Sequence, residues 1–340
     1  MPCETPLKLL AGRRPATDAY DADIIILSRN RPAETIEAIQ SALAQRGGTF
    51  HVTVLDQGSA PETRQNLARI FSRTPYFTLY GCSQNLGVAN GRNLLATLGH
   101  GQIIVSLGNH AIFAEKWVVA RAVRAFGQRP ELGALGFNIL CADGLHPDRS
   151  SWGYPPRLIS RFKDRFDTTT FVDVGHAIRR VTWNTAGGYD PSLLFAWEAY
   201  DFCLSAIASG WKIGYDGALA VIHKAPPEAD IGWSATRMTY SVRNRLLIGR
   251  KWGASWLALS PRIIGYLIRG LRNGCLMATL DGIQAAHAAD HPTHRKMSKE
   301  MRRYISVHET RYRGSWLEWL RAEGLEQVDP TPEPVQRARG

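Results

Sequence analysis

Glu198 and Asp201 are the pair of residues whose types and spacing best suit acid–base chemistry in this sequence. They follow a turn at 187–191 and precede an amphipathic run that ends at Gly210. If a helix begins here, the two carboxylates share a face, and one of them can take a proton from a hydroxyl nucleophile. The competing interpretation is structural, because the helix dipole favours carboxylates in a first helical turn.

Alternating strands and helices precede this pair and would position a ligand beside it. Apolar runs predict strands at 24–27, 52–55, 77–80 and 103–105, with helices from Pro32, from a capping box at Ser59 and Glu62, after Gly87, and at 117–126. This order predicts an α/β fold with a mostly parallel sheet flanked by helices. Val172, Val174 and Ile178 are expected to return the chain to the sheet edge.

Polar residues close three of the predicted strands, at 28–31, 56–59 and 106–110. Ligands of parallel sheets bind outside the carboxyl ends of the strands, so these residues are candidates for binding. The sequence has no G-x-G-x-x-G and no P-loop motif, which argues against a standard dinucleotide or P-loop site.

The composition is that of a globular chain with an anionic partner. The 340 residues carry a formal net charge of +11, and the basic excess is heaviest from Arg237 onward. No motif in that region suggests nucleic-acid binding, so a phosphorylated substrate or a membrane surface fits better. Five scattered cysteines without metal-ligand spacing indicate a reducing, cytosolic compartment, and the N-terminus is unlike a signal peptide.

The order of motifs over roughly 22–250 resembles that of the family 2 glycosyltransferases, which are GT-A nucleotide-sugar transferases. The segments that carry the resemblance lie at 24–31, 54–59, 85–93, 179–190, 198–203 and 240–245. The last of them, Tyr-x-x-Arg-Asn-Arg, is common in rhamnosyltransferase-like members. The resemblance implies a flexible segment at 1–20, a GT-A domain at 21–235, a helical region at 236–325 and a disordered tail at 326–340.

The resemblance also implies a donor site built from strand-end residues. Its candidate residues are Ser28, Asn30, Arg31, Asp56, Asn85, Arg92, Asn109 and Arg243. Asp56 would accept the N3–H of a uracil or thymine ring, and Arg92 would pair with the diphosphate. The competing interpretations are a turn-forming aspartate for Asp56 and a solvated helix arginine for Arg92.

The sequence departs from the family at the metal site. Where the family has Asp-x-Asp, residues 106–111 have no carboxylate. His110 and His223 could form an atypical site for Mn²⁺ or Mg²⁺. Alternatively, cationic side chains (Arg92, Arg243, Arg245 and Lys224) neutralise the diphosphate, and the sequence favours this metal-independent alternative.

A second departure is Ala199, which occupies the position of the family's usual base. Asp201 is then the favoured base and Glu198 its competitor. Loss of both usual carboxylate positions also permits a degenerate relative that binds nucleotide or glycan without catalysis and scaffolds other transferases.

Aromatic residues and a basic helix are the candidates for acceptor binding. Trp152, Trp183 and Trp197 could stack on acceptor sugars, although ordinary packing explains them as well. In the run 257–271, Ile263, Ile264, Leu267 and Leu271 are expected on one side, with Arg262, Arg269 and Arg272 on the other. This pattern is typical of a membrane-surface helix, and packing on the catalytic domain or in a homodimer is the alternative.

These observations predict an inverting glycosyltransferase that uses a UDP- or dTDP-sugar. Its acceptor would be a glycan or a lipid-linked saccharide in bacterial polysaccharide or lipopolysaccharide synthesis. The expected location is cytoplasmic, at the inner face of the cell membrane.

Overall fold

The computed structural model describes residues 7–16, 19–224, 235–289 and 295–312. Within these residues one ten-stranded sheet runs in the order β1-β4-β3-β2-β5-β9-β7-β10-β6, with β8 paired to β10. The strands are β1 (Lys8–Gly12), β2 (Ala22–Ser28), β3 (Phe50–Gln57), β4 (Phe77–Cys82), β5 (Ile103–Gly108), β6 (Ala111–Phe113), β7 (Leu132–Leu140), β8 (Arg165–Thr168), β9 (Gly175–Arg179) and β10 (Lys212–His223). The predicted tail at 326–340 lies outside the described residues.

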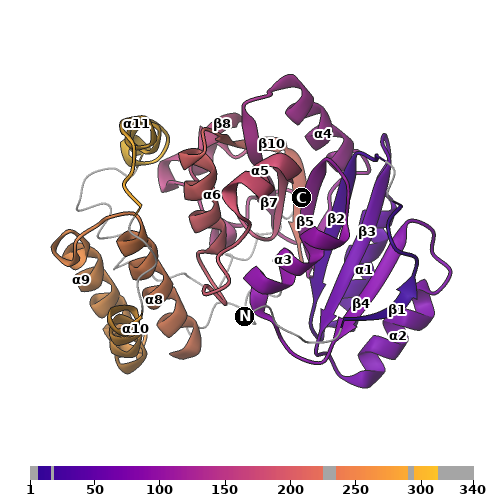
Figure 1. The fold of residues 1–340 in the computed structure, drawn as a ribbon, viewed down its shortest axis with the longest axis horizontal. Coiled ribbons are helices and arrows are strands. Elements are labelled where there is room, and N and C mark those ends of the chain that lie inside the picture. The colour runs from indigo at the N-terminus through magenta and orange to yellow at the C-terminus, as the bar shows by residue number, and fades with distance from the viewer. Residues whose placement is uncertain (1–6, 17–18, 225–234, 290–294, 313–340) are drawn as a thin grey trace, which may run out of the picture.

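Helices cover the sheet and form a separate group beside it (Figure 1). They are α1 (Pro32–Leu43), α2 (Pro61–Phe71), α3 (Gly87–Leu98), α4 (Val118–Gln128), α5 (Arg180–Ala186), α6 (Glu198–Ala208), α8 (Ala235–Lys251), α9 (Trp256–Arg272), α10 (Leu276–Ala288) and α11 (Lys299–His308), with short 3₁₀ turns η1 (Arg149–Ser151), η2 (Pro156–Arg161) and η3 (Thr310–Tyr312). The predicted helical C-terminal region is therefore present over its described residues.

The α/β prediction is confirmed at the centre of the sheet, where β4, β3, β2 and β5 run parallel. Strand β2 shows why its apolar run is continuous. Ile24 and Ile26 pack against α1, α2 and α4, whereas Ile25 packs on the opposite face with α3, α5 and α6. Successive side chains of a strand point to opposite faces, so a sheet covered on both sides needs apolar residues at every position.

Three local predictions were wrong. The segment predicted as flexible at 1–20 contains β1, which pairs antiparallel with β4. Strand β9 lies between β5 and β7 inside the sheet and not at its edge. Helix α2 has Ala60 as its N-cap and no side-chain cap, because the Ser59 hydroxyl donates to Asp56 and accepts from the Asn30 backbone N–H.

Helices α8, α9 and α10 have a core of their own and dock on the α/β part through α8, whereas Met301 of α11 lies in the core of the α/β part. Met238, Val242 and Leu246 of α8 pack with α9 and α10. The Asn244 side chain donates to the carbonyls of Phe195 and Ala196, just before α6. No helix within the described ranges is both long enough and apolar enough to cross a membrane.

Candidate active site

The ends of β2 and β3 form one hydrogen-bonded unit. Asp56 is fully buried and accepts from Ser28 Oγ at 3.3 Å, from the Ser59 backbone N–H at 3.1 Å and from the Ser59 hydroxyl. Asn30 and Arg31 both adopt positive φ (56° and 50°), so the chain turns sharply between β2 and α1. Asp56 therefore stabilises the turn after β3, as the structural interpretation of this residue requires. This turn lies at the strand end where donor binding was predicted.

Two glycines fix the position of the Asn85 loop. Gly58 has φ +80, and a Cβ on it would lie 3.1 Å from the Ser83 carbonyl oxygen. Gly87 has φ +77, and a Cβ there would lie 2.6 Å from the Leu194 carbonyl oxygen. Larger residues would be strained and crowded at both positions. Gly58 therefore keeps the Asn85 loop next to the turn after β3, and Gly87 keeps the same loop against the segment before α6.

A chain of polar contacts joins the end of β5 to the end of β10. Asn109 Nδ2 donates to Thr35 Oγ1 at 3.1 Å, and Asn109 Oδ1 lies 3.2 Å from His110 Nδ1. The rings of His110 and His223 lie 4.8 Å apart between centroids. His223 Nδ1 lies 2.6 Å from Asp148 Oδ2. The two histidines predicted to act together are thus neighbours.

The histidine pair does not supply a complete protein shell for a metal ion. No group of three or more His, Cys, Asp or Glu side chains in the described part of the chain is arranged to hold a metal. His223 Nε2 is buried and has no hydrogen-bond partner among the described residues, while Asp148 orients the ring through Nδ1. A carboxylate behind a histidine is a common second shell of metal sites, but two imidazoles alone are an insufficient donor set for Mg²⁺ or Mn²⁺, which prefer oxygen ligands.

The first buried ion cluster joins Arg92, Asp173 and Glu198, and we call it the cleft cluster. Arg92 is 6% exposed and forms an ion pair with Asp173, whose backbone carbonyl it also contacts at 2.7 Å. Glu198 is 2% exposed and its carboxyl group is hydrogen-bonded to that of Asp173. Arg92 is therefore buried rather than solvated, and it serves as the counter-ion of Asp173 beside the end of β5, where the Gly108 backbone N–H donates to the Val174 carbonyl oxygen.

Charge is distributed unequally between the two carboxyl groups of the cleft cluster. Burial, followed by the negative charge of Asp173, raises the pKa of Glu198 well above its usual value. Burial is the largest influence on Asp173 and acts to raise its pKa, but the Arg92 guanidinium together with the interactions with His176 and Glu198 outweighs burial, so the pKa of Asp173 lies below its usual value. Glu198 is then neutral and Asp173 ionised near neutral pH.

The second buried ion cluster joins Asp190, Asp201 and Lys251, and we call it the docking cluster. Lys251 Nζ of α8 lies 2.7 Å from Asp201 Oδ2 and 3.0 Å from Asp190 Oδ2. Burial raises the pKa of Asp201, and Lys251 offsets only part of that shift. The helix predicted to begin near Glu198 is confirmed, but Asp201 on it is an internal partner of α8.

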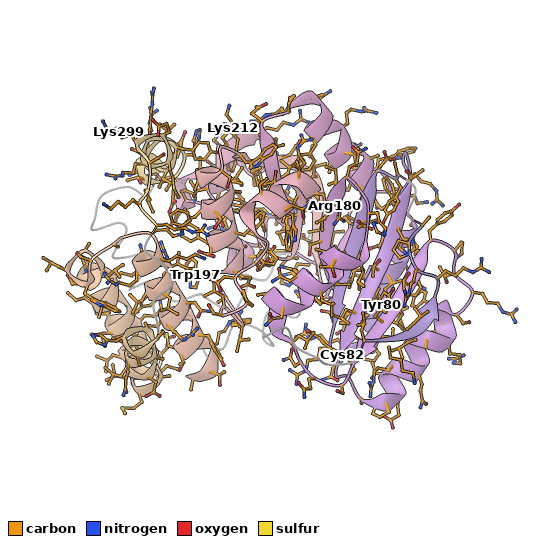
Figure 2. All side chains as sticks on the ribbon, viewed as in Figure 1. Tyr80, Cys82, Arg180, Trp197, Lys212 and Lys299 are labelled. Carbon is orange, nitrogen blue, oxygen red and sulfur yellow. The ribbon has the colours of Figure 1, made fainter. Side chains whose placement is uncertain are left out.

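A cleft of about 890 Å³ opens between the α/β part and the C-terminal helices. Trp152 and Trp197 line it, and in Figure 2 Trp197 lies between those two parts of the molecule. Ala199 and Asp173 also line it. Trp183 is instead 7% exposed and packs against Tyr189 and Phe202 in the core.

Three further arginines of the predicted segments have structural partners, and one of them lines the cleft. Arg243 donates to the Ser192 carbonyl oxygen at 3.2 Å and to Asn244 Oδ1 at 2.7 Å. Arg180 of the predicted 179–190 segment pairs with Asp23 (its position is labelled in Figure 2). Arg245, predicted as a diphosphate partner, lines the cleft with its guanidinium over the rings of Trp197 and Tyr200.

The sequence interpretation missed Thr35, Asp148 and Asp173. Thr35 is fully buried and joins Ser28 to Asn109. Asp148 and Asp173 lie in irregular segments without a motif and find their partners far along the chain, at separations of 75 and 81 residues. Thr35 is the fourth residue of the helix that follows Arg31. This position is the one signal in the sequence that could have indicated where its side chain points.

Comparison with known proteins finds matches to the α/β part. Residues 23–184 match the family model of Glycosyl transferase family 2. The fold is similar to that of the mannosyltransferase PcManGT from Pyrobaculum calidifontis, solved with GDP-Man and Mn²⁺ (16% identity, TM-score 0.57, 94% of this chain and 88% of that one). It is also similar to that of GalNAc-T7, solved with UDP, GalNAc and Mn²⁺ (14% identity, TM-score 0.59, 80% of this chain and 58% of that one). A protein of Haemophilus influenzae described as uncharacterized is 24% identical over 167 residues, which cover 48% of this chain and 90% of the relative.

Proposed function

We propose that this protein, whose residues 23–184 match the model of glycosyl transferase family 2, transfers a sugar from a nucleotide-sugar donor to a saccharide acceptor. The observation that carries the proposal is the cleft of about 890 Å³ with aromatic and charged walls. Sugar sites combine flat aromatic surfaces with a few placed polar groups. In a GT-A fold the donor occupies the carboxyl ends of the strands, so the cleft is left for the acceptor.

The proposed donor is a UDP- or dTDP-sugar. Asp56, at the end of β3, would read the N3–H of the base, with Ser28, Asn30, Arg31 and Asn85 around it. The similar enzymes were solved with GDP-Man and with UDP, so a guanosine donor belongs in the test. Inversion at the anomeric carbon by a single displacement, and rhamnosyl transfer suggested by the 240–245 segment, are parts of the same proposal.

The proposed acceptor carries an anionic group, as a phosphate-linked lipid saccharide does. Arginines from three elements line the cleft, namely Arg157 of η2, Arg237 and Arg245 of α8, and Arg262 and Arg269 of α9. The acidic residues among the described lining are Asp173 and Glu309. Guanidinium groups suit phosphate, which they bind in a bidentate manner. The synthesis of bacterial polysaccharide or lipopolysaccharide would supply an acceptor of this kind.

A membrane-surface role is proposed for α9. Leu257, Ile264 and Leu271 follow one another at seven-residue spacing and are 83%, 53% and 68% exposed. Arg262 and Arg269 of the same helix face the cleft. We propose that this stripe contacts an anionic bilayer at the inner face of the cell membrane, with the acceptor headgroup in the cleft. Co-sedimentation with vesicles that contain anionic lipid should fall when all three residues are changed to serine. If the stripe instead forms a homodimer, the molecular mass of the protein in solution should depend on its concentration.

The donor test is binding and turnover of UDP-, dTDP- and GDP-sugars with Mn²⁺, Mg²⁺ or EDTA. Activity that persists in EDTA supports the metal-independent alternative with cationic side chains at the diphosphate. Activity that needs Mn²⁺ and is lost in His223→Ala, but not in His146→Ala, assigns His110 and His223 to a metal. His146 is a suitable control because it is exposed and pairs with Asp143 outside the cleft.

The second candidate is a relative that binds a nucleotide or glycan without catalysis. Ala199 at the usual base position and the burial of Glu198 and Asp201 favour it. Tight nucleotide binding without turnover, in the presence of phosphate-bearing acceptors, would establish this candidate and reject the transferase.

A further inference from the structure

We infer that Asp173, and not a carboxylate of α6, is the base that takes the proton of the acceptor hydroxyl. The inference rests on the proposed transferase function and assigns one step within it. It is carried by the position of Asp173 in the cleft cluster and by its access to the cleft.

Access separates Asp173 from the carboxylates of α6. The Asp173 side chain is 32% exposed and lines the cleft. Glu198 and Asp201 are each 2% exposed, and Asp201 is bound to Lys251. A base must come within hydrogen-bond reach of the proton it removes, and an acceptor in the cleft can meet Asp173 without any movement of α6.

Ala199 explains why a residue on another element can act as the base. Ala199 lines the same cleft, in the first turn of α6. Its methyl group can neither accept a proton nor reach as far as a longer side chain. Asp173, which precedes β9, borders this space from the sheet side. The cleft that Ala199 lines therefore also contains a carboxylate from another element.

The partners of Asp173 keep it in the form that a base needs. Arg92 holds the carboxylate by an ion pair, and the neutral Glu198 donates its proton in a hydrogen bond to it. One oxygen of Glu198, Oε2, is buried with no hydrogen-bond partner among the described residues, which also favours the neutral acid. His176 beside them is neutral, because burial and then Arg92 lower its pKa to about 3. The negative charge therefore rests on the carboxyl group that the cleft exposes.

The step balances without any further reactant. The acceptor oxygen forms a bond to the anomeric carbon as the bond from that carbon to the donor phosphate oxygen breaks. The nucleoside diphosphate leaves with the electron pair, and the hydroxyl proton passes to the Asp173 carboxylate. Attack from the side opposite the leaving group inverts the anomeric carbon. The exposed side of Asp173 then releases the proton to water.

Asp173→Asn tests the inference in the full chain, with nucleotide release measured with and without acceptor. Loss of a general base typically costs about 10²–10⁴-fold in rate. We expect a loss of transfer in this range, unchanged affinity for the donor, and partial recovery of transfer by added formate in Asp173→Gly. Formate recovery is specific, because a carboxylate that only stabilises the fold would not restore turnover when supplied from solution.

Asp167→Asn is the matched control, since the Asp167 side chain is 21% exposed and pairs with Arg129 at 2.8 Å, and Asp167 is not among the residues that line the cleft. Its transfer rate should stay within a few-fold of the wild type. If Asp173→Asn unfolds because Arg92 loses its counter-ion, the double variant Arg92→Gln/Asp173→Asn removes both charges. A folded single or double variant that retains transfer overturns the inference. Wild-type protein that neither binds nor turns over any donor defeats the proposed function instead, so the two failures are distinct.

Discussion

The cleft cluster and the docking cluster have the same composition and opposite surroundings. Each contains two carboxyl groups and one cation, and each takes one carboxyl group from the first turn of α6. In the cleft cluster the cation is buried and the ionised carboxylate reaches the cleft, with Asp173 32% exposed. In the docking cluster the Lys251 side chain is 12% exposed and Asp201 3%, because α8 covers them.

The difference shows that spacing alone does not assign a chemical role. Glu198 and Asp201 share a helical turn. Glu198 is a neutral acid beside Asp173, whereas Asp201 forms an ion pair that joins α6 to α8. What separates them is the element packed against each side chain. The following predictions test that separation, from the largest expected effect to the smallest.

Lys251→Met should destabilise the protein by about 3–5 kcal/mol, because it leaves Asp201 and Asp190 buried without their cation. The free energy of unfolding is measured by urea denaturation. Lys212→Met is the control, since Lys212 is 46% exposed and 3.8 Å from Glu131, and it should change stability by less than about 1 kcal/mol. Equal effects of the two variants would show that the docking cluster does not hold α8 in place.

Glu198→Gln should change the pH dependence of stability. The raised pKa of Glu198 means that the folded state keeps a proton which the unfolded state releases above its ordinary pKa. The stability that this neutral acid contributes is fully present below about pH 4.3, and it is lost as pH rises towards the folded-state pKa, by up to about 1.4 kcal/mol per pH unit. Glutamine has no proton to lose, so the variant should gain stability relative to the wild type between pH 5 and 7.

Urea denaturation at several pH values measures this difference. Arg92, Asp173, Tyr189 and His176 are the titratable or charged groups around Glu198, and all remain in the variant. The carboxyl group of Asp173, whose pKa is lowered, acts in the opposite sense, and its contribution is lost as pH falls. A constant difference between variant and wild type across this range would mean that Glu198 is ionised in the folded protein.

Much of the fold was predictable from the sequence, and the cleft cluster was not. Continuous apolar runs such as 24–27 predict buried strands because both faces of the sheet are covered. Strand β9 was misplaced because an apolar run does not specify which neighbours a strand inserts between. The ion pair of Arg92 with Asp173 depends on tertiary contacts between elements 81 residues apart, for which one sequence has no local signal.

Asp201→Asn should cost about 1 kcal/mol in stability and leave transfer within tenfold of the wild type. Asparagine can still accept a hydrogen bond from Lys251, which retains Asp190, so only the gain from a charged acceptor is lost. Both values come from the same preparations, by urea denaturation and by the transfer assay. A loss of transfer as large as that of Asp173→Asn would return the base to α6 and reverse the roles of the two clusters.

Trp197→Phe should have the smallest effect on transfer, because Trp197 is an uncharged residue of the cleft wall that contacts Ser241 and Arg245 of α8. Its Nε1 donates to the Ser241 carbonyl oxygen of α8 at 3.1 Å, and its ring lies against the Arg245 guanidinium in the cleft. Phenylalanine keeps an aromatic wall and loses the hydrogen bond, which is worth about 0.5–1.5 kcal/mol of stability. Acceptor KM should rise only a few-fold. Trp183→Phe, in the core, is the control and should leave acceptor KM unchanged. A rise in acceptor KM as large as that of Trp197→Phe would mean that both tryptophans act through stability. The cleft wall would then not contact the acceptor.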